Sequence, residues 1–272
     1  MILFPNAKIN LGLRVTAKRP DGYHDIETAM VPVPGLCDAL EILRDEGDGC
    51  TFSTSGIAID APAGKNLCVR AYDLMHSRYG IGGVKMHLHK NVPFAAGLGG
   101  GSADAVFALK MLGELFTLNI SEDELEALAA ELGSDTPFFV RNRPMIATGR
   151  GEKLTPCDID LSAYRVVIVK PPVGVSTAQA YARIVPAHPI QPLATLLAED
   201  IGRWRESVHN DFEPVVFATC PELATIKERL YACGARYAAM SGSGSAIFGL
   251  FDHLPDELRF PADYFVYTGN ML

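Results

Sequence analysis

Hydrophobic and polar residues alternate along residues 7–15, where the polar positions include Lys8 and Asn10. A period of two is typical of a β-strand with one buried face, so Lys8 and Asn10 share the opposite, polar face. An Asp-Gly pair at 21–22 predicts a turn after this strand. Alternation or short apolar runs predict further strands at 37–43, 84–90, 165–169, 237–241, 246–251 and 264–267.

Apolar residues at helical spacing predict helices over 65–79, from 105 to 116, and from Pro221 to about 233. Ser121 and Glu124 form a capping box that opens another helix, and Gly133 is placed to end it. The proline-rich stretch 141–160 predicts irregular structure. Strands and helices alternate without the rhythm of a parallel βαβ array, so we expect an α+β fold in two lobes, residues 1–155 and 156–272.

Composition narrows the class of protein. Of the 272 residues, 48% are hydrophobic, which is typical of a globular protein. The net charge of −8 argues against general binding to the phosphate backbone of nucleic acids. Six cysteines form no C-x-x-C pair, no secretory signal is recognisable, and no apolar run is long enough to cross a bilayer. We therefore expect a cytoplasmic protein that binds neither nucleic acid nor membrane; its oligomeric state stays open.

Glycines gather at 97–101, between the strand predicted at 84–90 and the helix predicted from 105. Glycine allows positive φ and close approach of a ligand to the backbone, and a helix N-terminus adds partial positive charge. Together these features predict a phosphate cradle. The alternative is a tight strand-to-helix connection, but so many glycines reduce stability, which favours polyphosphate binding.

Two common phosphate signatures are missing: no Lys-Ser or Lys-Thr follows the glycines, and Ser102 stands where G-x-G-x-x-G needs its last glycine. The remaining pattern, P-x-x-x-G-L-G-G-G-S-x-D, resembles the phosphate loop of the GHMP kinases. Segments 5–11 and 240–248 resemble the other two motifs of that superfamily, in the same order. The resemblance implies a two-lobed GHMP kinase fold, with a ribosomal protein S5 domain 2-like N-terminal lobe, a ferredoxin-like C-terminal lobe and a substrate cleft between them. It also implies ATP with Mg²⁺.

Segments 19–25 (RPDGYHD) and 132–139 (LGSDTPFF) narrow the resemblance. They are similar to the superfamily members that phosphorylate a hydroxyl of a small cytidyl alcohol in isoprenoid precursor synthesis. One alternative is a mevalonate- or homoserine-type kinase, whose substrates carry no base. Another is a catalytically inactive nucleotide-binding homologue, against which the retention of Lys8 and Asp135 weighs. Ala103 departs from the family, which often has a second serine there.

The resemblance also implies residue roles. Asp135 would accept the proton of the substrate hydroxyl, and Lys8 beside it would keep that carboxylate ionised and stabilise the transferred group. Asn10 would contact the substrate, Tyr23 would stack on the cytosine, His24 would bond its edge, and Tyr181 would cover its other face. Without the resemblance, Asp135 is a turn residue before Thr-Pro, and Tyr23 and His24 flank a hairpin. The residues expected at ATP are Lys65, Asn66, Lys90, Pro93, Phe94, Ala95, Ala96, Gly97, Leu98, Gly99, Gly100, Gly101, Ser102 and Ala103.

Ser102 has two compatible readings: its hydroxyl bonds a phosphate or a magnesium ion, or it is a plain helix N-cap. His87 and His89 share a strand face but have no evident third ligand, so we expect a solvated face there and no protein metal site. Magnesium would arrive with ATP and be held mostly by phosphate and water.

Overall fold

The computed structural model describes residues 1–58 and 62–271. Contacts divide the chain into two compact units. Unit 1 comprises Met1–Ala7, Leu36–Phe94 and Gly99–Asn142, and unit 2 comprises Lys8–Gly35, Ala95–Leu98 and Arg143–Leu272. The predicted lobes follow a single cut at residue 155 and stay a prediction.

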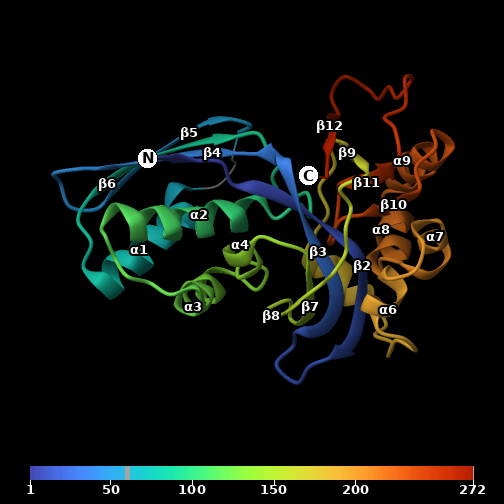
Figure 1. Ribbon diagram of the computed structural model, residues 1–272, viewed down its shortest axis with the longest axis horizontal. Coiled ribbons are helices and arrows are strands. Elements are labelled where there is room, and N and C mark those ends of the chain that lie inside the picture. Colours follow the sequence, from blue (N-terminus) through green and yellow to red (C-terminus); the bar gives the residue numbers. More distant parts are fainter. Residues whose placement is uncertain (59–61, 272) are drawn as a thin grey trace. The chain divides into compact units, whose positions relative to one another are not determined.

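Unit 1 is a four-stranded sheet with helices packed along one face (Figure 1). The strand order is β1-β4-β6-β5, and β5 pairs parallel to β6 while the other pairs are antiparallel. Helix α2 is buried along most of its length because α1, α3, α4 and β4 all contact it. The bounds are β1 Ile2–Leu3, β4 Ala39–Arg44, β5 Cys50–Gly56, β6 Val84–Lys90, the 3-10 helix η1 Ala63–Lys65, α1 Leu67–Tyr79, α2 Gly100–Leu115, α3 Glu122–Leu132 and α4 Phe138–Arg141.

Unit 2 contains two further sheets, with strand orders β2-β3-β7-β8 and β10-β11-β9-β12. The strands are β2 Asn6–Lys18, β3 His24–Cys37, β7 Met145–Gly149, β8 Lys153–Pro156, β9 Arg165–Lys170, β10 Tyr237–Met240, β11 Ile247–Phe251 and β12 Phe265–Asn270. The first residues of β2 and the last of β3 belong to unit 1. The helices are α5 Thr177–Arg183, α6 Leu193–Leu197, η2 Ile201–Arg203, α7 Trp204–Ser207, α8 Phe212–Thr219 and α9 Pro221–Ala232.

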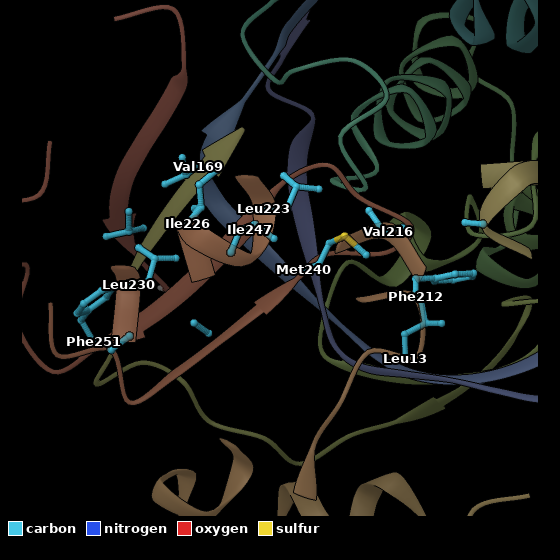
Figure 2. Packing of buried hydrophobic residues seen from close by; sticks show 14 of the residues in the cluster. Leu13, Val169, Phe212, Val216, Leu223, Ile226, Leu230, Met240, Ile247 and Phe251 are labelled. Atoms are coloured by element: carbon cyan, nitrogen blue, oxygen red, sulfur yellow. The ribbon is translucent and has the colours of Figure 1, made fainter. Parts of the chain in front are cut away.

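The core of unit 2 forms where α8 and α9 meet the strands (Figure 2). Ile226 and Leu230 of α9 pack in one cluster with Val169 of β9 and Ile247 of β11. Leu13 of β2 joins the same cluster, so this part of β2 is anchored in the core. Each fully buried side chain of this size contributes roughly 1.5–3 kcal/mol.

The most consequential error of the sequence interpretation concerns β2. Its residues were expected to bury one face, but both faces are buried along its first half. Lys8 is 4% exposed and Asn10 is 3% exposed. The alternation was real, but the polar face is covered by other segments of the chain, which a period-two pattern does not report.

The second error concerns residues 141–160, which were expected to be irregular. They contain β7 and β8, which pair with each other, and β7 also pairs with β3. Strands β3 and β5 were not predicted either. Sheet pairing supplies the hydrogen bonds that hold these segments extended, and the prolines lie at the margins of the hairpin, at 144 and 156.

The other predicted elements are confirmed within a few residues. Ser121 caps α3 by accepting from the Glu124 N–H, and Gly133 follows its last turn. Pro221 occupies the first turn of α9, where its missing N–H costs nothing. No helix in the described part of the chain is long and apolar enough to cross a membrane.

Candidate functional site

The glycine loop joins β6 to α2, as predicted. Left-handed backbone recurs at every second residue: φ is 50° at Ala95, 76° at Gly97 and 70° at Gly99. Gly99 is the N-cap of α2, and no side chain among the described residues caps that helix end. Alternating backbone of this kind directs successive N–H groups toward one concavity, a geometry that binds anions.

Three segments that are distant in the sequence meet at the carbonyl group of Gly97, within unit 2. Lys8 Nζ and Ser241 Oγ each donate a hydrogen bond to the Gly97 carbonyl oxygen, both at 2.8 Å. The Ala246 N–H donates to the neighbouring carbonyl of Ala96 at 3.1 Å. A Cβ on Gly97 would lie 2.0 Å from the Ser241 carbonyl oxygen. Glycine is therefore required here both for its φ and for this close approach.

A buried polar network holds Lys8 in place. Lys8 Nζ also donates to Asn10 Oδ1, and Asn10 Nδ2 donates to Thr28 Oγ1 at 3.0 Å. Because Asn10 is engaged on both sides, it orients Lys8, and its direct contact with substrate stays a prediction. Asn210 supports the same region by donating to the carbonyls of Met240 and Gly242 at 2.7 and 2.8 Å.

The sequence interpretation assigned no role to Thr28, Asn210 or Ser241. Ser241 stands inside a motif that was recognised, so the motif itself was a signal. Thr28 and Asn210 carried no local signal, because only the tertiary contacts bury them beside the recognised segments.

Asp135 lies in unit 1, in the short connection between α3 and α4. Ser102, in the first turn of α2, donates its hydroxyl to Asp135 Oδ1 at 2.8 Å. The N-cap reading of Ser102 is wrong, because Gly99 holds that position. Thr136 Oγ1 is buried and finds no hydrogen-bond partner in the residues that the structure describes. Lys8 belongs to unit 2, so its expected approach to Asp135 stays a prediction.

The residues expected at the base lie around the turn from β2 to β3 and on α5. The His24 ring stacks on Tyr181, with ring centres 5.0 Å apart, and Tyr181 meets Phe212 edge-on at 4.8 Å. Tyr23 is 57% exposed. The Arg150 guanidinium lies over its ring at 4.9 Å, a partner that the sequence did not reveal. His24 and Tyr181 thus lie together, and their contact with a cytosine stays a prediction.

Lys90, expected beside the nucleotide, is 3% exposed and paired with Asp38 and Asp104. These two carboxylates raise the pKa of Lys90 although burial opposes them. Burial, with the charge of Asp38, raises the pKa of Asp104 to about 8 against the opposing charge of Lys90. Direct contact of Lys90 with nucleotide stays a prediction.

The other residues expected to bind ATP differ in how far they are exposed to solvent. Lys65 is exposed in η1, and Asn66 is the N-cap of α1, where its Oδ1 accepts from the Cys68 N–H at 2.9 Å. Phe94 is exposed, whereas Ala96, Leu98 and Ala103 are buried. The ring nitrogens of His87 and His89 hydrogen-bond to Ser53 and Ser55 on the neighbouring strand.

Comparison with known proteins agrees with this geometry. The model for the GHMP kinases N terminal domain matches residues 66–143, and that for the GHMP kinases C terminal matches residues 193–260. The chain is therefore a GHMP kinase, an ATP-dependent phosphotransferase, and the predicted α+β GHMP kinase fold is confirmed.

Relatives narrow the family further. A 4-diphosphocytidyl-2-C-methyl-D-erythritol kinase of Parabacteroides distasonis is 48% identical over 274 residues, which cover 100% of both chains. One of Bacteroides fragilis is 47% identical over 94% of this chain and 93% of its own. A crystal structure of 4-(cytidine 5'-diphospho)-2C-methyl-D-erythritol kinase has a TM-score of 0.76 and 36% identity, covering 92% of this chain and 90% of that one. The chain belongs to the family of 4-diphosphocytidyl-2-C-methyl-D-erythritol kinases.

Proposed function

We propose that this kinase transfers the γ-phosphoryl group of ATP to the 2-hydroxyl of 4-diphosphocytidyl-2-C-methyl-D-erythritol, a step of the non-mevalonate isoprenoid pathway. The observation that carries the proposal is the meeting of the three motif segments: Lys8 and Ser241 donate to the Gly97 carbonyl, and Ala246 donates to the neighbouring carbonyl of Ala96. Full-length similarity to kinases named for this substrate supports it.

The glycine loop is proposed to hold the ATP phosphates through the N–H groups at the start of α2. The alternating left-handed backbone and the uncapped helix end fit an anionic group. Mg²⁺ bound with ATP would neutralise phosphate charge, held mostly by phosphate oxygens and water. Phosphoryl transfer depends on positioning and on charge neutralisation, and a preorganised loop supplies the first of these.

Asp135 is proposed to accept the proton of the attacking hydroxyl, and Lys8 to stabilise negative charge on the transferred group. The Ser102 hydroxyl orients the Asp135 carboxylate by its hydrogen bond to Oδ1. A lysine that is almost wholly buried and fixed by two acceptors keeps its ammonium in one place, as electrostatic stabilisation of a transition state requires.

Tyr23, His24 and Tyr181 are proposed to bind the cytosine. Removal of the ring in Tyr23→Ala is expected to raise KM for the cytidyl alcohol by about fivefold or more, since stacking on a base contributes about 1–3 kcal/mol. KM for ATP should stay unchanged. Steady-state kinetics with each substrate varied in turn measures both constants.

Tyr23→Phe is the matched control, because it keeps the ring and its contact with Arg150 while losing only the hydroxyl. Its KM values should lie close to those of the unaltered enzyme. A rise in KM for ATP alone in Tyr23→Ala would contradict the base pocket.

ADP release tests the proposed reaction directly. The enzyme with Mg-ATP is given the cytidyl alcohol, mevalonate or homoserine in separate assays. Turnover with the cytidyl alcohol only is the expected result. Turnover with mevalonate or homoserine instead, or ATP binding without turnover on any of the three, would contradict the proposal.

A further inference from the structure

A buried triad of ionisable side chains joins three elements of unit 1. Lys90, the last residue of β6, pairs with Asp38, which precedes β4, and with Asp104 Oδ2 in α2 at 2.8 Å. The side chains of Lys90, Asp38 and Asp104 are 3%, 0% and 4% exposed. An ammonium and two carboxyl groups thus lie together in the interior, away from water.

The triad holds both ends of the glycine loop. At the first end, Asp38 Oδ1 accepts from the N–H groups of Asn91 and Val92 at 2.7 and 2.8 Å. At the second end, Lys90 Nζ binds Asp104 in the second turn of α2. A Cβ placed on Gly100 would lie only 3.2 Å from Lys90 Nζ and 2.9 Å from a methyl of Val92. The ammonium therefore lies directly beneath the first residue of α2.

The triad is a costly way to obtain stability. Asp104 Oδ1 is buried and has no hydrogen-bond partner within residues 1–58 and 62–271. Desolvation of such a group opposes folding, and buried ion pairs are often no more stabilising than apolar residues of the same volume. What apolar residues do not provide is fixed direction, whereas charge-assisted hydrogen bonds are short and strong and hold a backbone segment to a defined geometry.

We propose that Lys90, Asp38 and Asp104 are positioning residues for ATP, which hold the two ends of the glycine loop so that its N–H groups face the phosphates. The proposal rests on the proposed placement of ATP at this loop. It gives Lys90 an indirect role, through the loop backbone, in addition to the predicted contact with nucleotide.

The decisive comparison is Asp104→Leu against Asp104→Asn. Leucine has a similar volume but no acceptor for Lys90, whereas asparagine keeps an acceptor in place. We expect Asp104→Leu to raise both Kd and KM for Mg-ATP by about tenfold or more, since small misplacements of binding groups have effects of this size. KM for the cytidyl alcohol should change by less than about twofold, because the triad holds the loop proposed to bind ATP and not the residues proposed to bind the base. Asp104→Asn should restore most of the ATP affinity. Calorimetric titration with Mg-ATP and steady-state kinetics measure these quantities, and thermal unfolding reports stability.

Lys90→Arg is a second variant in case Asp104→Leu does not fold. It keeps the positive charge, but its larger head group adjoins Gly100, where space is tight, so it should displace the triad and the first residue of α2. It should fold and still bind ATP more weakly.

Lys110→Met is the matched control for a general loss of stability that does not involve the triad. Lys110 is a partly buried lysine on the same helix, bonded to the carbonyls of Phe139 and Val140. It lies ten residues beyond Gly100, or about 15 Å along the axis. The Lys110→Met variant should be less stable to thermal unfolding but should bind ATP with unaltered affinity.

Each of the following results would overturn the proposal. If folded Asp104→Leu or Lys90→Arg enzyme had an unaltered Kd for Mg-ATP, the triad would have no positioning role. Equal weakening of ATP binding by Lys110→Met shows that the effect is not specific to the triad. Gly101→Asp places a negative charge in the first turn of α2. If this variant bound ATP with unaltered affinity, ATP would not bind at the loop, and the proposed function would be overturned as well. Loss of ATP binding in Gly101→Asp together with normal binding in folded Asp104→Leu overturns the triad proposal alone.

Discussion

Asp135→Asn is expected to lower kcat by at least about 10²-fold, the low end of the range for general acid–base catalysis. The amide has the size of the carboxylate, and its oxygen still accepts the hydrogen bond from Ser102, which lies 2.8 Å away. The fold should therefore be kept. What the variant loses is the negative charge and the ability to take the proton of the attacking hydroxyl.

The measurement is ADP release at saturating Mg-ATP and cytidyl alcohol, with thermal unfolding to verify that the variant is folded. Glu131→Gln is a suitable control, because this carboxylate lies on α3 in the same unit, is exposed, and pairs with Arg78 at the surface. It should leave kcat unchanged. Turnover of Asp135→Asn within a few-fold of the unaltered enzyme would remove Asp135 from the proposed role.

Gly101→Asp is expected to weaken ATP binding by about 10²-fold or more. A carboxylate in the first turn of α2 would lie at the helix end where the phosphates are proposed to bind, and two like charges about 4 Å apart repel by about 4 kcal/mol at an effective dielectric constant of 20. The substitution should not harm folding. Among the described residues, a Cβ at Gly101 meets only a methyl of Leu67, at an ordinary 3.7 Å, and a negative charge near a helix N-terminus is stabilising.

Gly101→Ala separates charge from bulk. It adds the same Cβ with no carboxylate, so most of the ATP affinity should remain. Titration of each variant with Mg-ATP gives the two dissociation constants. Equal affinities for the aspartate and alanine variants would mean that the phosphates bind elsewhere.

Local patterns carried much of the fold and the class of protein. The capping of α3 by Ser121, the proline at the start of α9 and the strand before the glycine loop were predictable because each depends on residues close in the chain. The order of three short motifs then indicated a GHMP kinase. Strands β7 and β8 were missed because their stability comes from pairing with each other and, for β7, with β3, more than a hundred residues earlier.

The sequence by itself determined that a glycine loop joins a strand to a helix, and that the chain carries the motifs of a kinase for a cytidyl alcohol. Only the tertiary structure decided what lies around that loop. Lys8 is a buried donor to the Gly97 carbonyl and not a solvated strand lysine, and Lys90 is the centre of an ion triad beneath α2. The physical reason is that burial and charge pairing depend on segments far apart in the chain. A residue's own neighbours reveal which face of a strand it occupies, but not what covers that face.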